Sequence, residues 1–258
     1  MSLVYNLDFI SDKAKKSNIK KAIAILEKAY YTHIETSSFF LDPFEQRVIE
    51  SIARKNSIDI LFIGGNEKSE RKIFVANYYY EPLFEGNYIK ILSFNSFSIG
   101  HPDVLGALLH LGIDRNSIGD ISILDGRIEF AVLETDSSFI KYNLTKIKRE
   151  GINLEIKSDN YLNLTELDYE NLSGFVSSLR LDNILTVMLN LSRSKVKDLI
   201  SSRLIKVNFQ IITDPSLVVE ESSMISVRRE GRFIFDQVTG QSKKGNYHIE
   251  YRKVIWYI

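Results

Sequence analysis

A cluster of cations and small hydroxyl side chains in the last third of the chain has the composition of a phosphate-binding surface. Ser192 can cap a helix, and Arg193, Ser194 and Lys195 then lie in the first turn of that helix. Backbone N–H groups and the positive end of the helix dipole meet at this turn, so an anion is stabilised there. Arginine can donate two parallel hydrogen bonds to a phosphate, and lysine adds a point charge. The spacing therefore predicts a clamp for RNA phosphates.

Further cations and one amide extend this predicted RNA-binding surface along the chain. A basic run after residue 227 has two interpretations, because charge also protects a solvated sheet edge from pairing. We favour RNA contact, since the preceding segment is already basic. The predicted set consists of Arg180, Ser192, Arg193, Ser194, Lys195, Lys197, Arg203, Lys206, Asn208, Arg228, Arg232, Lys243 and Lys244.

Asp182 follows Arg180 in a pattern that resembles the aspartate motif of pseudouridine synthases. That motif works inside a large catalytic domain, and nothing upstream supplies such a domain. We therefore predict that Asp182 is a helix cap or an ion-pair partner rather than a catalytic residue.

The formal net charge of zero conceals a split along the chain. Residues 1–174 hold 20 Lys and Arg against 25 Asp and Glu, whereas residues 175–258 hold 13 against 8. Such asymmetry points to a polyanion as partner of the basic part. The competing explanation is a chance distribution over solvated faces.

Several kinds of chemistry lack support in the composition. The chain has no cysteine, so no disulfide framework or thiolate metal site is expected. Its four histidines have no metal-binding spacing, and we expect no cofactor. No segment approaches the roughly 20 apolar residues of a membrane helix, and the first residues do not resemble a signal peptide. These features predict a cytoplasmic, non-enzymatic protein that does not bind membranes.

The first third of the chain alternates helical and strand patterns. From Ile19 to Ile34 apolar residues recur at helical spacing, and Asp42-Pro43-Phe44-Glu45 is a strong helix start. Residues 58–63 and 73–79 are predicted as strands. The cluster Tyr78-Tyr79-Tyr80 at the end of the second strand is predicted to be partly buried.

The middle of the chain predicts a β-α-β-β-α-β order, which is the ferredoxin-like motif that RNA-recognition modules share. The hairpin signal Asp125-Gly126 separates its second and third strands. The third strand offers a single aromatic residue, Phe130, whereas base stacking needs two or more, so Phe130 is predicted to lie in the core. The predicted elements are strand 88–94, helix 102–111, strands 118–124 and 127–134, helix 139–149 and strand 152–157.

The chain is thus predicted to be an α+β protein of three parts. An N-terminal α/β domain spans residues 1–85, and a ferredoxin-like middle domain spans residues 86–158. A polar connector with room for one strand covers residues 159–179. A small α/β RNA-binding domain with a C-terminal extension covers residues 180–258.

This last domain resembles the small RNA-binding domain of ribosomal protein S-four. The shared pattern is Arg180-Leu181-Asp182, Ser192-Arg193, Leu199-Ile200 and Val207-Asn208. The chain departs from the pattern at three turn positions, where the family commonly has glycine. Arg203 ends the second helix, Phe209 follows Asn208, and Ser222-Ser223 replace a Gly-Asp turn.

The whole chain resembles the YlmH-type bacterial proteins. The similarity lies in Phe40-Leu41-Asp42-Pro43, Gly64-Gly65 with Glu70-Arg71-Lys72, residues 101–109, Leu111-Gly112-Ile113, Ile118-Gly119-Asp120-Ile121, Gly231-Arg232-Phe233 and Lys243-Lys244-Gly245. The resemblance implies a protein that binds ribosomal or transfer RNA and associates with the large ribosomal subunit. It also implies a role in rescue or quality control of stalled translation, and the family has been tied to cell division.

Two other functions stay open. The acidic first two domains are compatible with a protein-interaction scaffold, for example in cell division, in which they would bind a protein partner. An RNA-modifying enzyme would need a pocket with perturbed acids or a bound cofactor, and the sequence identifies neither.

Overall fold

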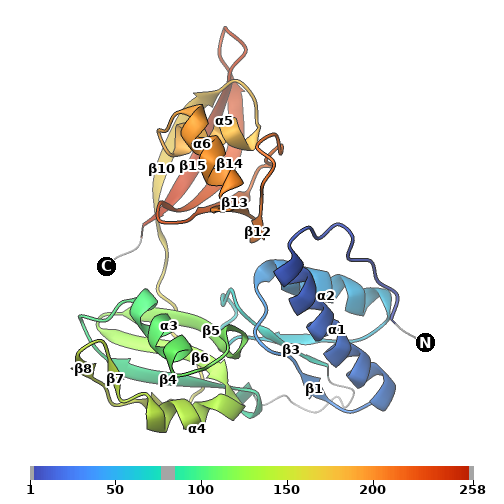
Figure 1. Ribbon diagram of the computed structural model, residues 1–258, viewed down its shortest axis with the longest axis vertical. Helices are drawn as coiled ribbons and strands as arrows, with labels where there is room; N and C mark the ends of the chain where they lie inside the picture. Colours follow the sequence, from blue (N-terminus) through green and yellow to red (C-terminus); the bar gives the residue numbers. More distant parts are fainter. Residues whose placement is uncertain (1–2, 77–84, 256–258) are drawn as a thin grey trace. The chain divides into compact units, whose positions relative to one another are not determined.

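The computed structural model describes residues 3–76 and 85–255, and divides the chain into two compact units, Met1–Thr165 and Glu166–Ile258 (Figure 1). The tyrosine cluster 78–80 and the end of the predicted strand 73–79 lie outside the described residues. The mixture of helices and strands confirms the predicted α+β class. Among the described residues, no helix has both the length and the apolar character needed to cross a membrane.

The first part of unit 1 consists of two helices over a small antiparallel sheet. Helix α1 (Lys13–Thr32) buries Ile19, Ala22, Ile23 and Leu26, as the helical spacing predicted. The same pattern was wrong at its end, because Tyr30 is exposed and Ile34 is exposed beyond the helix, which ends at Thr32. Helix α2 (Pro43–Lys55) begins with the predicted capping box, in which Asp42 and Glu45 each accept a hydrogen bond from the other's backbone N–H. The sheet has the order β1-β3-β2, formed by β1 (Thr36–Ser37), β2 (Leu61–Ile63) and β3 (Ile73–Ala76).

The second part of unit 1 confirms the ferredoxin-like prediction. Its antiparallel sheet has the order β5-β6-β4-β9, so the first and third strands of the motif lie in the centre. Phe130 is fully buried in this sheet, as predicted. The elements are β4 (Ile89–Asn95), α3 (His101–His110), β5 (Ile118–Leu124), β6 (Arg127–Leu133), α4 (Glu134–Asn143) and β9 (Glu155–Ile156), with short 3-10 turns at Glu85–Asn87 and Arg115–Ser117.

The helix predicted at 139–149 was placed too late, because α4 begins at Glu134 and ends at Asn143. Glu134 and Asp136 lie in its first turn, where carboxylates interact favourably with the helix dipole. The helix cannot continue through Lys148, whose φ of 53° is left-handed. Residues after α4 instead form a small hairpin of β7 (Lys146–Ile147) and β8 (Glu150–Gly151).

The two predicted N-terminal domains share a core, which explains why they form one unit. Phe40, Ile73 and Val75 from the first part pack with Ile91 and Ala131 from the second. Gly119 makes this contact possible, since a Cβ at that position would lie 2.6 Å from the Phe40 ring. The residues 64–72 and 118–120 that carry the YlmH resemblance therefore lie at the junction of the two parts.

A buried polar cluster reinforces the same junction. The carboxylate of Asp120 accepts hydrogen bonds from the backbone N–H groups of Glu70 (2.6 Å) and Arg71 (3.2 Å). The Arg71 guanidinium donates to the carbonyls of Ile118 (2.9 Å), Phe40 (2.9 Å) and Arg115. Burial lowers the pKa of Arg71, and burial together with nearby Arg71 lowers the pKa of Arg115 to about 10. Burial raises the pKa of Asp120.

Unit 2 is a six-stranded antiparallel sheet with two helices on one face. The strand order is β10-β15-β14-β13-β11-β12. Residues 168–176, which fell within the predicted connector, form β10 and pair along their whole length with β15. The elements are β10 (Asp168–Val176), α5 (Leu181–Met188), α6 (Arg193–Ser201), β11 (Ile205–Val207), β12 (Gln210–Ile211), β13 (Ser223–Val227), β14 (Gly231–Gln241) and β15 (Tyr247–Ile255).

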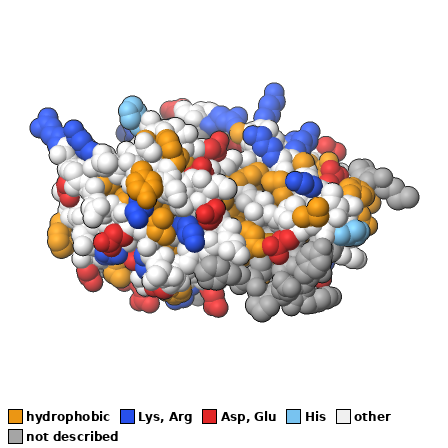
Figure 2. Space-filling model, turned by 90° about the horizontal axis from the view of Figure 1, so that it is seen from below, with side chains coloured by type: hydrophobic (Ala, Val, Ile, Leu, Met, Phe, Trp, Pro, Cys, Tyr) orange, Lys and Arg blue, Asp and Glu red, His pale blue; other side chains and the backbone are white. Residues whose placement is uncertain are grey.

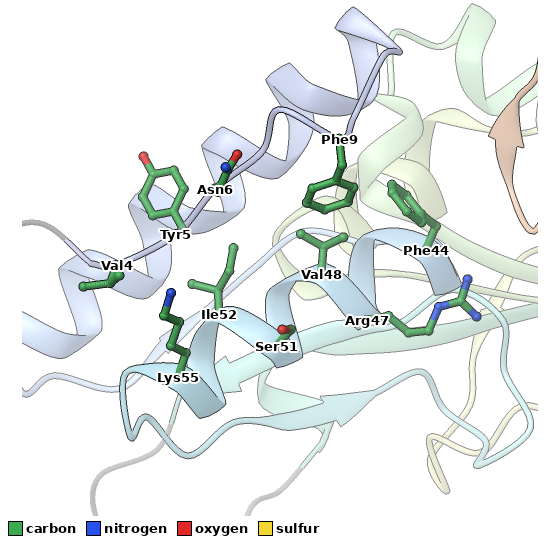
Figure 3. Close-up of a pocket in the computed structure, with 10 residues that line it drawn as sticks. All are labelled: Val4, Tyr5, Asn6, Phe9, Phe44, Arg47, Val48, Ser51, Ile52 and Lys55. Atoms are coloured by element: carbon green, nitrogen blue, oxygen red, sulfur yellow. The ribbon is translucent and has the colours of Figure 1, made fainter.

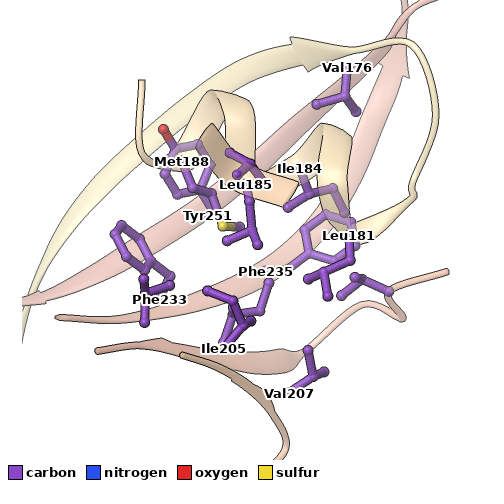
Figure 4. Packing of buried hydrophobic residues seen from close by; sticks show 14 of the residues in the cluster. Val176, Leu181, Ile184, Leu185, Met188, Ile205, Val207, Phe233, Phe235 and Tyr251 are labelled. Carbon is purple, nitrogen blue, oxygen red and sulfur yellow. The ribbon is translucent and has the colours of Figure 1, made fainter. Parts of the chain in front are cut away.

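The core of unit 2 lies between the helices and the sheet. Leu181, Ile184 and Leu185 of α5 pack against Phe233 and Phe235 of β14, as Figure 4 shows. Gly174 on β10 is required for this packing, because a Cβ there would lie 2.4 Å from the side chain of Val187.

Replacing Arg71 tests the junction in unit 1. Arg71→Ala leaves main-chain carbonyls at the junction without their donors, and each unsatisfied buried group costs about 1–3 kcal/mol. We expect the free energy of unfolding of unit 1 to fall by about 2–4 kcal/mol, measured by hydrogen exchange of β4 and β6 in the full chain.

The exposed Arg54, which pairs only with Glu50 on its own helix, supplies the matched control. Arg54→Ala should change the stability by less than about 0.5 kcal/mol. Equal effects of the two substitutions would show that the Arg71 hydrogen bonds do not hold the junction.

Candidate nucleic-acid interface

The junction of α5 and α6 is organised by one buried carboxylate. Asp182 is fully buried and accepts hydrogen bonds from Arg180 (3.1 and 3.3 Å) and from Arg193 (3.1 and 3.0 Å). Burial alone would raise the pKa of Asp182, but the hydrogen bonds from the two guanidiniums outweigh it and lower that pKa. Asp182 is thus an ion-pair partner, one of the two predicted roles. The helix cap itself is Arg180.

This arrangement, which we call the Asp182 cluster (Arg180, Asp182 and Arg193), presents two arginines at the surface. The Arg180 and Arg193 side chains remain 39% and 52% exposed, although their carboxylate partner is inaccessible. The carboxylate therefore fixes the direction of both guanidiniums and leaves part of each open to a ligand. Arg193 also contributes to the fold, because its loss would leave Asp182 with a single partner.

The other predicted residues of α6 lie on its exposed side or at its start. The Ser192 hydroxyl caps the helix by accepting from the Lys195 N–H, so this side chain is already engaged. Ser194, Lys195 and Lys197 are exposed on α6 beside Arg193. Val196 and Ile200 point the other way, into the core. The helix therefore separates a polar face for a ligand from an apolar face for packing.

The three departures from the glycine pattern keep the backbone conformation of glycine. Arg203, Phe209 and Ser222 have φ values of 60°, 71° and 62°, in the left-handed region that favours glycine. These three residues therefore adopt the backbone conformation that glycine adopts most easily, at a cost of roughly 1–2 kcal/mol for each residue. At Phe209 the ring contacts the Arg232 guanidinium, whose centre lies 6.0 Å from the ring centroid.

The predicted set does not form one continuous patch. Lys206, Ser226 and Arg232 make a cross-strand row that alternates with the buried Ile205 and Val227. Since α5 and α6 cover the buried side, this row lies on the opposite face of the sheet. Lys206 and Arg232 are therefore separated from the clamp on α6.

The remaining cations mark the two ends of β14. Arg228 lies beside the end of α6, where its N–H donates to the Leu204 carbonyl (3.0 Å). Lys243 and Lys244 lie in the β14–β15 turn at the far end, about 35 Å along the 11-residue strand. Asn208 has a structural role. Its side-chain oxygen accepts a hydrogen bond from the Met224 N–H (2.9 Å), and its side-chain nitrogen donates to the Ser223 hydroxyl (3.3 Å).

A second candidate surface, which the sequence reasoning missed, lies on unit 1. A groove of about 290 Å³ runs between the N-terminal segment, residues 3–10, and α2 (Figure 3). The exposed aromatic residues Tyr5 and Phe9 line it with Arg47 and Lys55. In the sequence, the signal for this surface was the pair of aromatic residues, Tyr5 and Phe9, just before the lysine-rich helix α1. In the described residues, no cluster of His, Cys, Asp and Glu could hold a metal ion.

Comparisons with known proteins agree with this architecture. Residues 179–225, which include the Asp182 cluster, match the family model of the S4 domain. Residues 83–162, which include the ferredoxin-like sheet, match the model described as a putative RNA-binding domain in YlmH. Unit 2 is thus built around an S4 domain.

Two relatives extend the similarity beyond these domains. The chain is 31% identical over 219 residues to the ribosome-associated protein quality control protein P2 of Bacillus subtilis (strain 168), covering 83% of this chain and 85% of the relative. The fold resembles the cell division protein ylmH from Streptococcus pneumoniae, with a TM-score of 0.52 and 18% identity over 60% of this chain and 95% of the other. The chain therefore belongs to the YlmH family, with a C-terminal S4 domain.

The Asp182 cluster predicts a pH-dependent stability. Asp182→Asn should lower the free energy of unfolding of unit 2 by about 1–3 kcal/mol at pH 7, less than a fully buried pair because both arginines are partly exposed. Since folding lowers the pKa of Asp182, its contribution is complete above the ordinary value near 4 and is lost as the pH falls through the lowered value. Hydrogen exchange of α5 and α6, referenced to intrinsic rates, measures this difference. If the free energy of unfolding of wild type and variant differed by the same amount from pH 7 to pH 3, Asp182 would not be the ionised partner of the two arginines.

Because Arg203 has a left-handed backbone conformation, its replacement should change the stability of unit 2 and its affinity for RNA in opposite directions. Arg203→Gly should raise the free energy of unfolding by about 0.5–1 kcal/mol, because glycine adopts this conformation without strain. The same variant should bind RNA more weakly, because it loses one predicted phosphate contact. Arg203→Lys serves as the control that keeps the charge and the strain. Thermal unfolding and RNA titration measure the two effects, and a destabilised glycine variant would show that Arg203 is not strained.

Proposed function

We propose that this protein binds RNA through the helix junction of its S4 domain and associates with the ribosome. The observation that carries the proposal is the Asp182 cluster, which holds two arginines at the surface beside the exposed Lys195 and Lys197. Guanidiniums with fixed directions suit the planar, bidentate recognition of phosphates. Membership of the YlmH family and the name of the Bacillus subtilis relative support the same function.

We further propose that the ligand is structured ribosomal or transfer RNA on the large ribosomal subunit. The family resemblance supports this ligand, and so does the electrostatic character of the interface on the S4 domain. In the described part of the ferredoxin-like sheet, Phe94 and Phe130 are buried, so they form no platform for base stacking. Capture of folded RNA by shape and charge would suit a role in the rescue or quality control of stalled translation, and the relative is named for ribosome-associated protein quality control. The protein would act in a cytoplasmic compartment and without catalysis of its own.

The phosphate contacts can be tested without disturbing the fold. Lys195→Glu/Lys197→Glu changes two exposed side chains and leaves Arg193 on Asp182. We expect wild-type protein to sediment with large ribosomal subunits in a lysate gradient and the variant to remain near the top. With purified RNA, the dependence of log K on log salt should become shallower by about 0.7–0.9 for each lost contact.

Lys141→Glu/Lys146→Glu in unit 1 changes the net charge by the same amount and is the matched control. It should sediment as wild type does. If both variants lose the ribosome equally, general charge rather than the α6 clamp drives the association. If the wild type stays at the top at low salt, the proposed ribosome partner is wrong.

A further inference from the structure

The groove on unit 1 is a built feature, because the N-terminal segment is fastened to both helices. Leu3, Leu7 and Ile10 are buried beneath the segment. The Leu3 N–H donates to Glu27 of α1 (3.3 Å), and Asn56, just after α2, bonds both the N–H (3.0 Å) and the carbonyl (3.3 Å) of Val4. The side chains that point away from these anchors are therefore held in place.

Two aromatic rings are exposed along this fastened segment, where Tyr5 is 40% exposed and Phe9 is 61% exposed. In Figure 3 the Phe9 ring lies over Val48 of α2, whereas the Tyr5 ring, at the other end of the groove, points away from Ile52. Rings that remain accessible in this way offer faces on which a planar ligand can stack.

Cations border the groove, and none of the described residues that line it is a carboxylate. Arg47 and Lys55 are exposed on the α2 side. On the α1 side, Lys16 pairs with Asp8 of the N-terminal segment (3.4 Å) and Glu27 accepts from the Leu3 N–H. Lys20 falls between Lys16 and Glu27 on the same side of the helix. The outer face of α1 continues this basic surface with exposed Lys13, Lys21 and Lys28. The groove therefore suits a ligand that combines planar apolar parts with negative charge.

Part of the positive charge at the start of α1 is paired within unit 1. The Asp12 carboxylate caps the helix, Lys15 pairs with Asp42, and Lys16 pairs with Asp8 (3.4 Å). Lys16 and Lys20 are nevertheless four residues apart, a spacing at which like charges destabilise a helix. A polyanionic ligand would relieve this repulsion.

We propose that this groove binds unpaired nucleotides of RNA. The bases stack on Tyr5 and Phe9, and the phosphates contact Arg47, Lys55 and Lys20. Aromatic stacking within a cationic groove is the usual means of binding single strands, whereas paired bases are not available to such rings. An acidic peptide would use the same cations but would have less need of the long lysine face of α1. The inference goes beyond the proposed function by assigning a second RNA site to unit 1, and its choice of RNA rests partly on that function.

The test measures binding of the full chain to a labelled oligo-uridine of ten nucleotides by fluorescence anisotropy. Tyr5→Ala/Phe9→Ala should weaken binding at least about tenfold, because each stacked base contributes substantially. Phe97→Ala/Tyr142→Ala removes two aromatic residues that are 93% and 75% exposed elsewhere on unit 1, and should leave the affinity unchanged. Arg47→Glu/Lys55→Glu should make the salt dependence shallower by about 1.4, for two contacts to a single strand. With 5-iodouridine in the RNA, ultraviolet crosslinks should map to Tyr5 or Phe9.

The outcomes separate this site from the S4 domain. Lys195→Glu/Lys197→Glu should retain the oligo-uridine affinity while it loses the ribosome. Equal affinities of the groove variant and the Phe97/Tyr142 control would overturn the inference and leave the groove to a peptide ligand. Oligo-uridine binding that disappears only with the α6 lysines would also overturn it, while the proposed function would stand. Oligo-uridine binding at the groove without ribosome association would support the inference and refute the proposed function.

Discussion

The arrangement of unit 2 depends on one buried carboxylate. Asp182 has no access to water and is bonded to Arg180 at the start of α5 and to Arg193 at the start of α6. An unpaired charge at this depth would be strongly unfavourable, so the two helix ends must stay together for the fold to persist. The requirement that stabilises the helix junction also places two guanidiniums at the surface. Folding and the proposed ligand recognition therefore draw on the same pair of residues, and a change at Arg193 would affect both.

Unit 1 uses buried charge for a different purpose. Arg71 and Asp120 satisfy backbone groups from three segments, at residues 40, 70–71 and 115–118, and join the small N-terminal sheet to the ferredoxin-like sheet. Their perturbed pKa values follow from burial, and they lie among main-chain atoms rather than in the groove. Perturbed titration is a common mark of an active site, but structural networks produce it as well. At this junction the geometry favours the structural explanation.

Local signals in the sequence predicted the elements whose causes are local. The capping box at Asp42 and the turn at Asp125-Gly126 depend on neighbouring residues. The pairing of β10 with β15 depends on distant partners, which a window of sequence does not contain. The start of α4 was missed although its acidic first turn, Glu134 and Asp136, is a local signal. The candidate site shows the same division. Exposed Lys195 and Lys197 on α6 followed from helical spacing, whereas the placement of Lys206 and Arg232 on the other sheet face required the register of β11, β13 and β14.

Net charge is a poor guide to where this protein meets a polyanion. Residues 1–174 carry more acidic than basic residues, and for this reason a protein partner of the first two domains was left open as an alternative. The fold gathers Lys13, Lys20, Lys21 and Lys28 on the outer side of α1, because the apolar residues between them turn inward. Elsewhere charges of both signs are mixed with hydrophobic side chains, as on the face in Figure 2. Electrostatic attraction acts over a Debye length of about 8 Å, so a ligand responds to such a local face and not to the sum over 174 residues. The net charge of a domain therefore hides a basic surface whenever the acidic residues of that domain lie more than a Debye length away from the surface.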